Sequence, residues 1–131
     1  MVEHPNVKRA EEYLNDFAMG DFAALRNYYS DDVIWHVAGN HQLSGDYHGR
    51  EQLFAYFDKV KKLTRGTLTL KAESILASDE HIALFVRASG KRGAKRLDAV
   101  MVEAFNVRPD GKWSEFWSMA DDQHDVDEFW A

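Results

Sequence analysis

Glu103 is the residue of this sequence whose surroundings most clearly indicate chemistry. It lies within residues 100–105, a run that is otherwise apolar and reads as a β-strand. A buried carboxylate is costly unless it is paired, so this group should either find a partner or stay protonated. Three interpretations follow: a neutral acid that donates to a ligand carbonyl or enolate, an ion pair with a residue such as Arg87, or exposure at the edge of a sheet. The residues leave all three open.

Tyr13 is a second group that could donate a hydrogen bond. It recurs at helical spacing with Val7, Ala10 and Phe17, which predicts that its side chain faces the interior. A buried tyrosine usually fills the core and bonds through its hydroxyl, so packing is the simpler interpretation and ligand contact is the functional one.

Three histidines could supply a general base, because imidazole titrates near neutral pH. His36 follows Trp35 on an expected strand, so it should face away from any pocket that Trp35 and Val37 line. His41 and His48 lie in a glycine-bearing loop that would border a pocket. Their spacing matches no metal-binding pattern, and we expect solvated side chains.

Several acids gather at the start of the last expected helix, where they suit the helix dipole. This run lacks the central glycine and distal glutamate of a calcium loop. Asp46 and Asp122 remain candidates for an acid at the pocket. The chain also lacks a phosphate-binding loop and a nucleophile motif, so we expect no metal and no nucleotide cofactor.

The elements that must position these groups follow from periodicity and turn signals. We expect helices over residues 5–20, 21–29, 50–63 and 121–130, with Asp21 and Asp121 as caps, and strands over residues 33–37, 67–77, 81–89, 96–107 and 112–119. Helices segregated from strands predict an α+β fold: a cone-shaped, curved antiparallel sheet packed against three N-terminal helices, with a short C-terminal helix. Residues 1–131 should form a single domain.

Composition narrows the possible partners. The 131 residues carry a net charge of −6, so nucleic acid is not expected, and the basic cluster at Lys91, Arg92, Lys95 and Arg96 reads as a solvated hairpin tip. The sequence shows no secretory signal and no membrane span, which favours a cytoplasmic location without membrane contact. Apolar residues that we assign to both faces of the sheet predict a homodimer: Leu68, Leu70, Ile75, Ile82, Leu84 and Val86.

An ordered set of short motifs gives the chain a family resemblance. The motifs are Met19-Gly20-Asp21, the run from Ser30 to His36, the run from Ser44 to Arg50, and the run from Asp110 to Trp117 followed by Asp121-Asp122. Together they resemble the SnoaL-like branch of the nuclear transport factor two-like superfamily, which includes polyketide cyclases, ketosteroid isomerase and non-catalytic binding proteins. The resemblance covers essentially the whole chain, although a fold shared by so many functions does not identify one.

The resemblance also assigns roles to individual residues. Ketosteroid isomerase holds an oxyanion with a tyrosine and a neutral carboxylic acid, and those positions fall here on Tyr13 and Glu103. The position of its proton-transferring aspartate falls on Val37, which argues against ketosteroid isomerase activity. We therefore expect an isomerase, cyclase or lyase that stabilises an enolate-type oxyanion on a small hydrophobic ligand or, alternatively, a non-catalytic binding protein. The expected pocket lining is Trp35, Val37, Tyr56, Phe57, Met101, Phe116 and Ser118.

Overall fold

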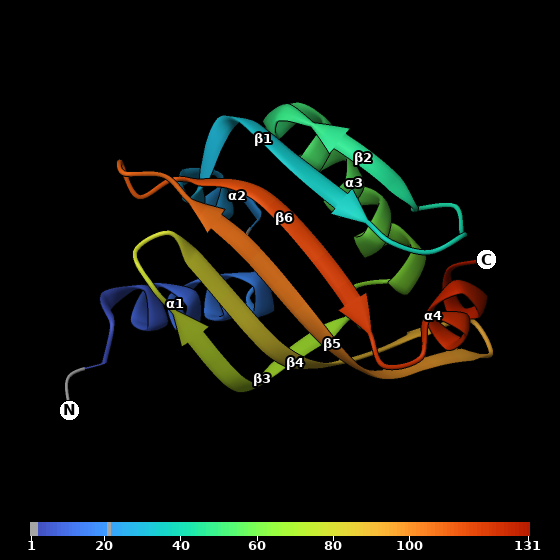
Figure 1. Cartoon of the computed structure of the whole chain (residues 1–131). Coiled ribbons are helices and arrows are strands. Elements are labelled where there is room, and N and C mark those ends of the chain that lie inside the picture. The colour runs from blue at the N-terminus through green and yellow to red at the C-terminus, as the bar shows by residue number, and fades with distance from the viewer. Residues whose placement is uncertain (1–2, 21) are drawn as a thin grey trace.

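The computed structural model describes residues 3–20 and 22–131 (Figure 1). The predicted cap Asp21 lies outside the described residues. In chain order the elements are α1 (Pro5–Ala18), α2 (Phe22–Leu25), a 3₁₀ turn η1 (Arg26–Tyr28), β1 (Tyr29–Val37), β2 (Gly45–His48), α3 (Gly49–Thr64), β3 (Thr69–Ala77), β4 (His81–Arg92), β5 (Lys95–Val107), β6 (Trp113–Ala120) and α4 (Gln123–Trp130).

The strands form one six-stranded sheet in the order β2-β1-β6-β5-β4-β3. Every neighbouring pair is antiparallel except β1 and β6, which run parallel. The expectation of a wholly antiparallel sheet is therefore wrong at this pair, because the long connection from β1 to β6 lets the chain return in the same direction. Strand β2 was also missed. Its glycine-rich segment reads as a loop, yet Tyr47 pairs with Trp35 of β1.

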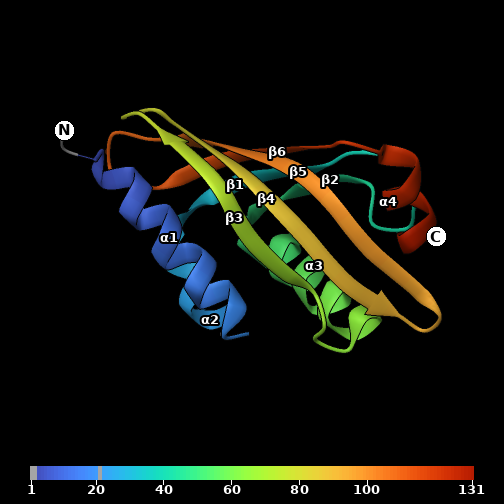
Figure 2. The same ribbon diagram turned by 90° about the horizontal axis from the view of Figure 1, so that it is seen from below.

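The helices lie on the concave side of the curved sheet. Figure 2 shows α1, α2 and α3 on the same side and α4 at one end, near the tip of the β4–β5 hairpin. Helix α1 packs along β3, α3 along β1, and α4 against β5. This arrangement confirms the α+β class and the curved sheet. In the described part of the chain, no helix is long and apolar enough to cross a membrane.

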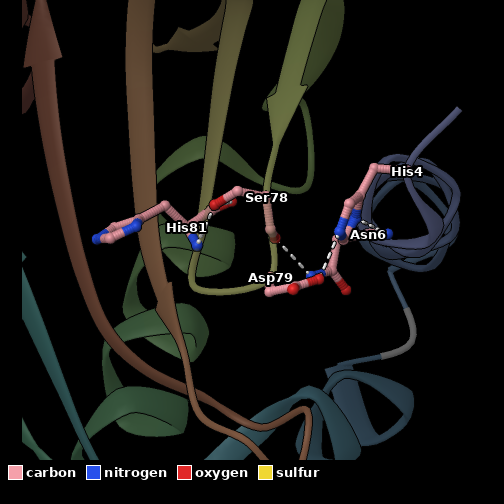
Figure 3. A network of polar contacts seen from close by, with 5 residues as sticks. All are labelled: His4, Asn6, Ser78, Asp79 and His81. Carbon is pink, nitrogen blue, oxygen red and sulfur yellow. Dashed lines mark hydrogen bonds and ion pairs between the residues drawn. The ribbon is translucent and has the colours of Figure 1, made fainter.

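Polar contacts fix the start of α1 against the β3–β4 turn (Figure 3). The Nδ1 atom of His4 accepts the backbone N–H of Asn6 at 3.1 Å and so caps the helix, while its Nε2 atom lies 2.8 Å from a carboxylate oxygen of Asp79. The side-chain amide of Asn6 donates to the carbonyl of Ser78 at 2.9 Å. These contacts hold the helix in an orientation that turns Tyr13 toward the sheet, where it is buried.

Buried and exposed side chains alternate along the central strands, which distinguishes the two faces of the sheet. In β4 the even-numbered residues from Ile82 to Ala88 are buried on the concave face, whereas Phe85 and Arg87 are exposed. A register shift between Ala72 and Ser74 changes the parity of β3 and turns Ile75 inward as well. All six residues that predicted apolar patches on both faces therefore belong to the concave side, and that basis for a homodimer was wrong.

The basic hairpin tip makes contacts that the sequence did not indicate. The guanidinium of Arg92 donates to the backbone carbonyls of Phe129 and Ala131 at 3.0 and 2.6 Å, and Lys95 donates to the carbonyl of Glu128 at 2.8 Å. Cations at the carboxyl end of a helix satisfy its free carbonyl groups and oppose its dipole. The cluster lies at a hairpin tip, as predicted, with Lys91, Lys95 and Arg96 exposed, and in addition Arg92 and Lys95 fix α4 in place.

Candidate functional site

A cavity lies between the concave face of the sheet and the helices. Its atom-free space, including the part that is open to solvent, is about 750 Å³. The structure places all nine residues selected from the sequence in its lining: Tyr13, Trp35, Val37, Tyr56, Phe57, Met101, Glu103, Phe116 and Ser118. Apolar walls with a few polar groups are typical of small-molecule sites.

Strand pairing explains why Glu103 faces this cavity. The strand β5 is interior to the sheet, and Glu103 pairs with Leu84 on β4 and Ser118 on β6. Leu84 is fully buried and Ser118 lines the cavity, so Glu103 shares the concave face with both. The pairing of β4 with β5 contains no register shift from His81 to Arg92, so no bulge turns the carboxyl away.

The other two interpretations of Glu103 are wrong. Arg87 lies on the convex face, where it contacts Glu73 at 3.2 Å and Asp98 at 2.9 Å. Because neighbouring side chains of a strand point to opposite faces, Arg87 and Glu103 are on different sides of the sheet. Exposure at a sheet edge is excluded because the edges are β2 and β3.

The carboxyl group of Glu103 has no protein partner among the described residues. Burial alone raises its pKa from 4.5 to about 7, because neither a cation nor a hydrogen-bond donor offsets the loss of hydration. Near neutral pH the group is therefore divided between a neutral acid, which can donate to a ligand oxygen, and a carboxylate.

The hydroxyl of Tyr13 is hydrogen-bonded to that of Tyr29, a residue that was not selected from the sequence. Its hydroxyl oxygen lies 2.5 Å from that of Tyr29, and both side chains are buried. Burial raises the pKa of Tyr13, the nearby carboxyl of Glu103 raises it further, and the hydrogen bond from Tyr29 lowers it. Tyr29 begins β1, whereas the sequence placed it at the end of the helix expected over residues 21–29 and started the strand at residue 33.

Trp35 and Tyr56 add two polar atoms to the walls. Trp35 stacks on Phe116 with ring centroids 3.6 Å apart, and its buried Nε1 atom has no hydrogen-bond partner of normal geometry in the described structure. Burial raises the pKa of Tyr56, and the charge of Glu103 adds to that effect. The Tyr13 and Tyr56 hydroxyls therefore lie close enough to Glu103 to respond to its charge.

The candidate bases outside the cavity have other partners. His36 faces away, as its strand parity predicted: its ring nitrogens lie 2.6 Å from Asp46 and 2.7 Å from Glu115, and these contacts raise its pKa. Asp122, and not Asp121, caps α4 by accepting the backbone N–H of Asp125 at 3.3 Å. His48, Asp46 and Asp122 are absent from the described cavity lining.

His41 and Gln123 line the mouth of the cavity, and neither was selected from the sequence as a binding residue. His41 comes from the loop after β1, and Gln123 is the first residue of α4. Asp127 joins the two segments because one of its carboxylate oxygens accepts both the backbone N–H of Asn40 and the side-chain amide of Gln123, each at 3.0 Å. These residues meet only when the loop contacts α4, so no local motif could have indicated them.

Across residues 3–20 and 22–131, no group of three or more histidine, cysteine, aspartate or glutamate side chains is arranged to hold a metal ion.

Comparison with known proteins identifies relatives along most of the chain. Residues 10–116 match the sequence profile of the SnoaL-like domain. An uncharacterized protein of Mycobacterium tuberculosis is 30% identical over 119 residues, which cover 88% of each chain.

Solved structures agree with this fold. The structure of Bal32a, from a soil-derived mobile gene cassette, has a TM-score of 0.90 at 28% identity and covers 96% of each chain. A protein of unknown function from Xanthomonas campestris gives 0.88 at 31% identity, covering 95% of this chain and 97% of the other. IdmH, a candidate polyketide cyclase from Streptomyces antibioticus, gives 0.73 at 19% identity, covering 90% and 93%, a likeness of fold alone.

Proposed function

Because this chain belongs to the SnoaL-like domain family, we propose that it binds a small hydrophobic organic compound in the cone cavity and holds one oxygen of that compound between Tyr13 and Glu103. The observation that carries the proposal is the unpaired carboxyl of Glu103, which burial keeps partly neutral in an apolar cavity. A buried polar group without a protein partner favours a ligand that supplies one.

Tyr13 would act as the second donor to the same oxygen. In this arrangement Tyr29 would be the donor to the Tyr13 oxygen in their hydrogen bond, which would leave the Tyr13 proton free to point at the ligand. Two such donors would favour an oxygen that carries negative charge, because hydrogen bonds to ions are stronger than those between neutral groups. The function supported best is stabilisation of an enolate-type oxyanion, as an isomerase, a cyclase or a lyase requires.

The non-catalytic alternative has an observation in its favour. Val37 lines the cavity at the position where the resemblance expects a base. Among the described lining residues only His41 and Glu103 could take up a proton, and the Nδ1 lone pair of His41 already accepts the backbone N–H of Leu43 at 3.1 Å. A protein with this lining could hold a phenol or an enol without turning over a substrate.

Binding of 2-naphthol and of naphthalene, measured by calorimetry, tests the oxygen site. Substituting Tyr13→Phe or Glu103→Leu should weaken 2-naphthol binding by about 1–3 kcal/mol and leave naphthalene binding nearly unchanged. Tyr28→Phe is the matched control because its hydroxyl bonds to Asp16 outside the cavity. Equal losses for both ligands, or no binding of 2-naphthol, would contradict the proposal.

Deuterium exchange separates the catalytic function from the binding one. In the catalytic case, deuteroxide from the solvent takes up the proton on the carbon beside the carbonyl of 2-tetralone, the electrons of that C–H bond form a C=C bond, and the carbonyl π electrons move to the oxygen. When the enolate returns to the ketone, the carbon takes a deuteron from D₂O. NMR in D₂O should then show exchange that depends on the protein and is lost in Tyr13→Phe. Binding of 2-tetralone without accelerated exchange would support the non-catalytic alternative.

We also propose a homodimer, formed through the convex face of the sheet. Cross-strand neighbours make two apolar rows there: Leu76, Ala83, Ala104 and Trp117, and beside them Phe85, Val102 and Met119. Leu76 is 63% exposed and Met119 is 65% exposed. A contiguous apolar surface of this kind favours association, and a twofold dimer covers the same patch on both copies.

A further inference from the structure

The mouth of the cavity carries two polar groups that the proposed function does not use. His41 lies in the loop between β1 and β2, and Gln123 opens α4. His41 contacts Leu43 and Trp130, which belong to the second core cluster, whereas Tyr13 belongs to the first. The two pairs of polar residues therefore lie at different ends of the same cavity.

The hydrogen bond from Leu43 determines which nitrogen of His41 carries the proton. The Nδ1 atom accepts the backbone N–H of Leu43 at 3.1 Å, so the neutral ring must carry its proton on Nε2. Burial lowers the pKa of His41, which favours this neutral form. The Nε2–H group makes no hydrogen bond of normal geometry in the described structure, and the weak contact of the ring with the backbone carbonyl of Ala38 leaves it available as a donor.

Asp127 fixes the amide of Gln123 in the same way. Its carboxylate accepts the amide nitrogen of Gln123 at 3.0 Å, so the amide must keep its nitrogen toward Asp127. A hydrogen bond from the backbone N–H of Asn40, also at 3.0 Å, holds that carboxylate in position. The carbonyl oxygen of Gln123 accepts no hydrogen bond in the described structure and remains a free acceptor at the mouth.

We infer that the ligand is a two-ended compound whose second end, opposite the oxygen held by Tyr13 and Glu103, carries a hydroxyl group bound by His41 and Gln123. A hydroxyl is the small group that both accepts and donates, so it can satisfy the His41 N–H and the Gln123 carbonyl together. The aromatic and aliphatic walls between the two ends match an apolar body. This inference rests on the proposed function because it requires that Tyr13 and Glu103 hold the oxygen at the first end of the ligand.

Matched pairs of phenols test the second end, with calorimetry giving each dissociation constant. The pairs are 2-naphthol with 2,6-dihydroxynaphthalene, and 4-phenylphenol with 4,4′-dihydroxybiphenyl, which differ in the distance between their oxygens. In at least one pair the diol should bind about tenfold tighter than the monophenol, beyond the factor of two from its symmetry.

Substitutions at the cavity lining identify the residues that are responsible for the tighter binding of the diol. His41→Phe and Gln123→Leu should each remove most of the advantage of the diol over the matched monophenol. His124→Phe, on the exposed side of α4, and Gln42→Leu, whose amide donates to the carbonyl of Trp130, are matched controls that should retain it.

The outcomes separate this inference from the proposed function. A diol advantage of no more than twofold in both pairs, together with Tyr13-dependent binding of the monophenols, would overturn the inference alone. An advantage that survives both variants would overturn it as well. Failure of every monophenol to bind would overturn the proposed function and this inference with it.

Discussion

The hydroxyl oxygens of Tyr13 and Tyr29 lie 2.5 Å apart, and of the two residues only Tyr13 borders the cavity. Tyr29 lies behind the wall, where its proton can be directed at the Tyr13 oxygen. The pair thus forms a short relay that points from the core toward a ligand. In this relay Tyr29 is a positioning residue.

Substitution Tyr29→Phe should weaken 2-naphthol binding by about 1 kcal/mol, less than Tyr13→Phe does, because Tyr13 keeps its proton but loses the donor that orients it. Naphthalene binding should not change, which separates this effect from general loosening of the core. Calorimetry with 2-naphthol and with naphthalene gives the change in affinity for each ligand. If the two affinities fall together, Tyr29 serves packing and not orientation.

The carboxyl of Glu103 should make stability depend on pH. Its pKa of about 7 in the folded protein exceeds the ordinary value of 4.5, so the folded state holds the proton more tightly. The free energy of unfolding should therefore fall as pH rises from about 4.5 to 7. The Glu103→Gln variant has no carboxyl at this position and should not lose stability in this way. The free energy of unfolding of the variant minus that of the parent should therefore increase by about 1–3 kcal/mol between pH 4 and pH 8.

Urea unfolding at a series of pH values measures this difference. Glu11→Gln, on the exposed side of α1, is the control for removing one negative charge. A parallel pH profile for parent and Glu103→Gln would mean that the carboxyl ionises without cost and is not held neutral by the cavity.

His36 should make the free energy of unfolding depend on pH over a different range. Its contacts with Glu115 and Asp46 raise its pKa above 6.5, so the stability they provide is present below pH 6.5 and is lost as pH rises through the folded-state pKa. Because its side chain is 28% exposed and that of Asp46 is 57% exposed, the contribution should be about 1 kcal/mol or less. His36→Gln should therefore cost stability at pH 6 and little at pH 9. His124→Gln, on an exposed histidine, should cost little at either pH.

The sequence predicted the class of fold because helical and strand periodicities are local. Glu103 could be singled out for a similar reason, since a carboxylate in an apolar strand is visible without a structure. Tyr29 could not be found in this way because its role depends on a residue 16 positions earlier in α1. His41 and Gln123 come together only through tertiary contacts of the loop and α4, and β2 was missed because its flanking glycines resemble loop signals.

The proposed dimer should be sensitive to charge on the convex face. Met119→Lys places an ammonium group at the β6 end of one apolar row, where a second copy would have to desolvate it. Light scattering at micromolar concentration should give twice the chain mass for the parent and one chain mass for this variant. Met19→Lys, at a still more exposed methionine just after α1, should remain dimeric. A parent that is monomeric under these conditions would refute the dimer.

The mouth of the cavity depends on close contact at Gly39. This residue has φ of +96°, and an added Cβ would collide with the Asp127 carboxylate and the Gln123 amide. Gly39→Ala should therefore break the contact between the loop and α4, lower the free energy of unfolding by about 1–3 kcal/mol, and speed hydrogen exchange in α4.

Gly111→Ala is the matched control: its φ is +84°, but no atom lies near the added Cβ, so it should cost only backbone strain and leave exchange in α4 unchanged. Because Gln123 would lose its fixed orientation, Gly39→Ala should also reduce the preference for the diol while retaining Tyr13-dependent binding of the monophenol. Equal exchange rates in the two variants would show that the position of α4 does not depend on its contact with the loop at Gly39.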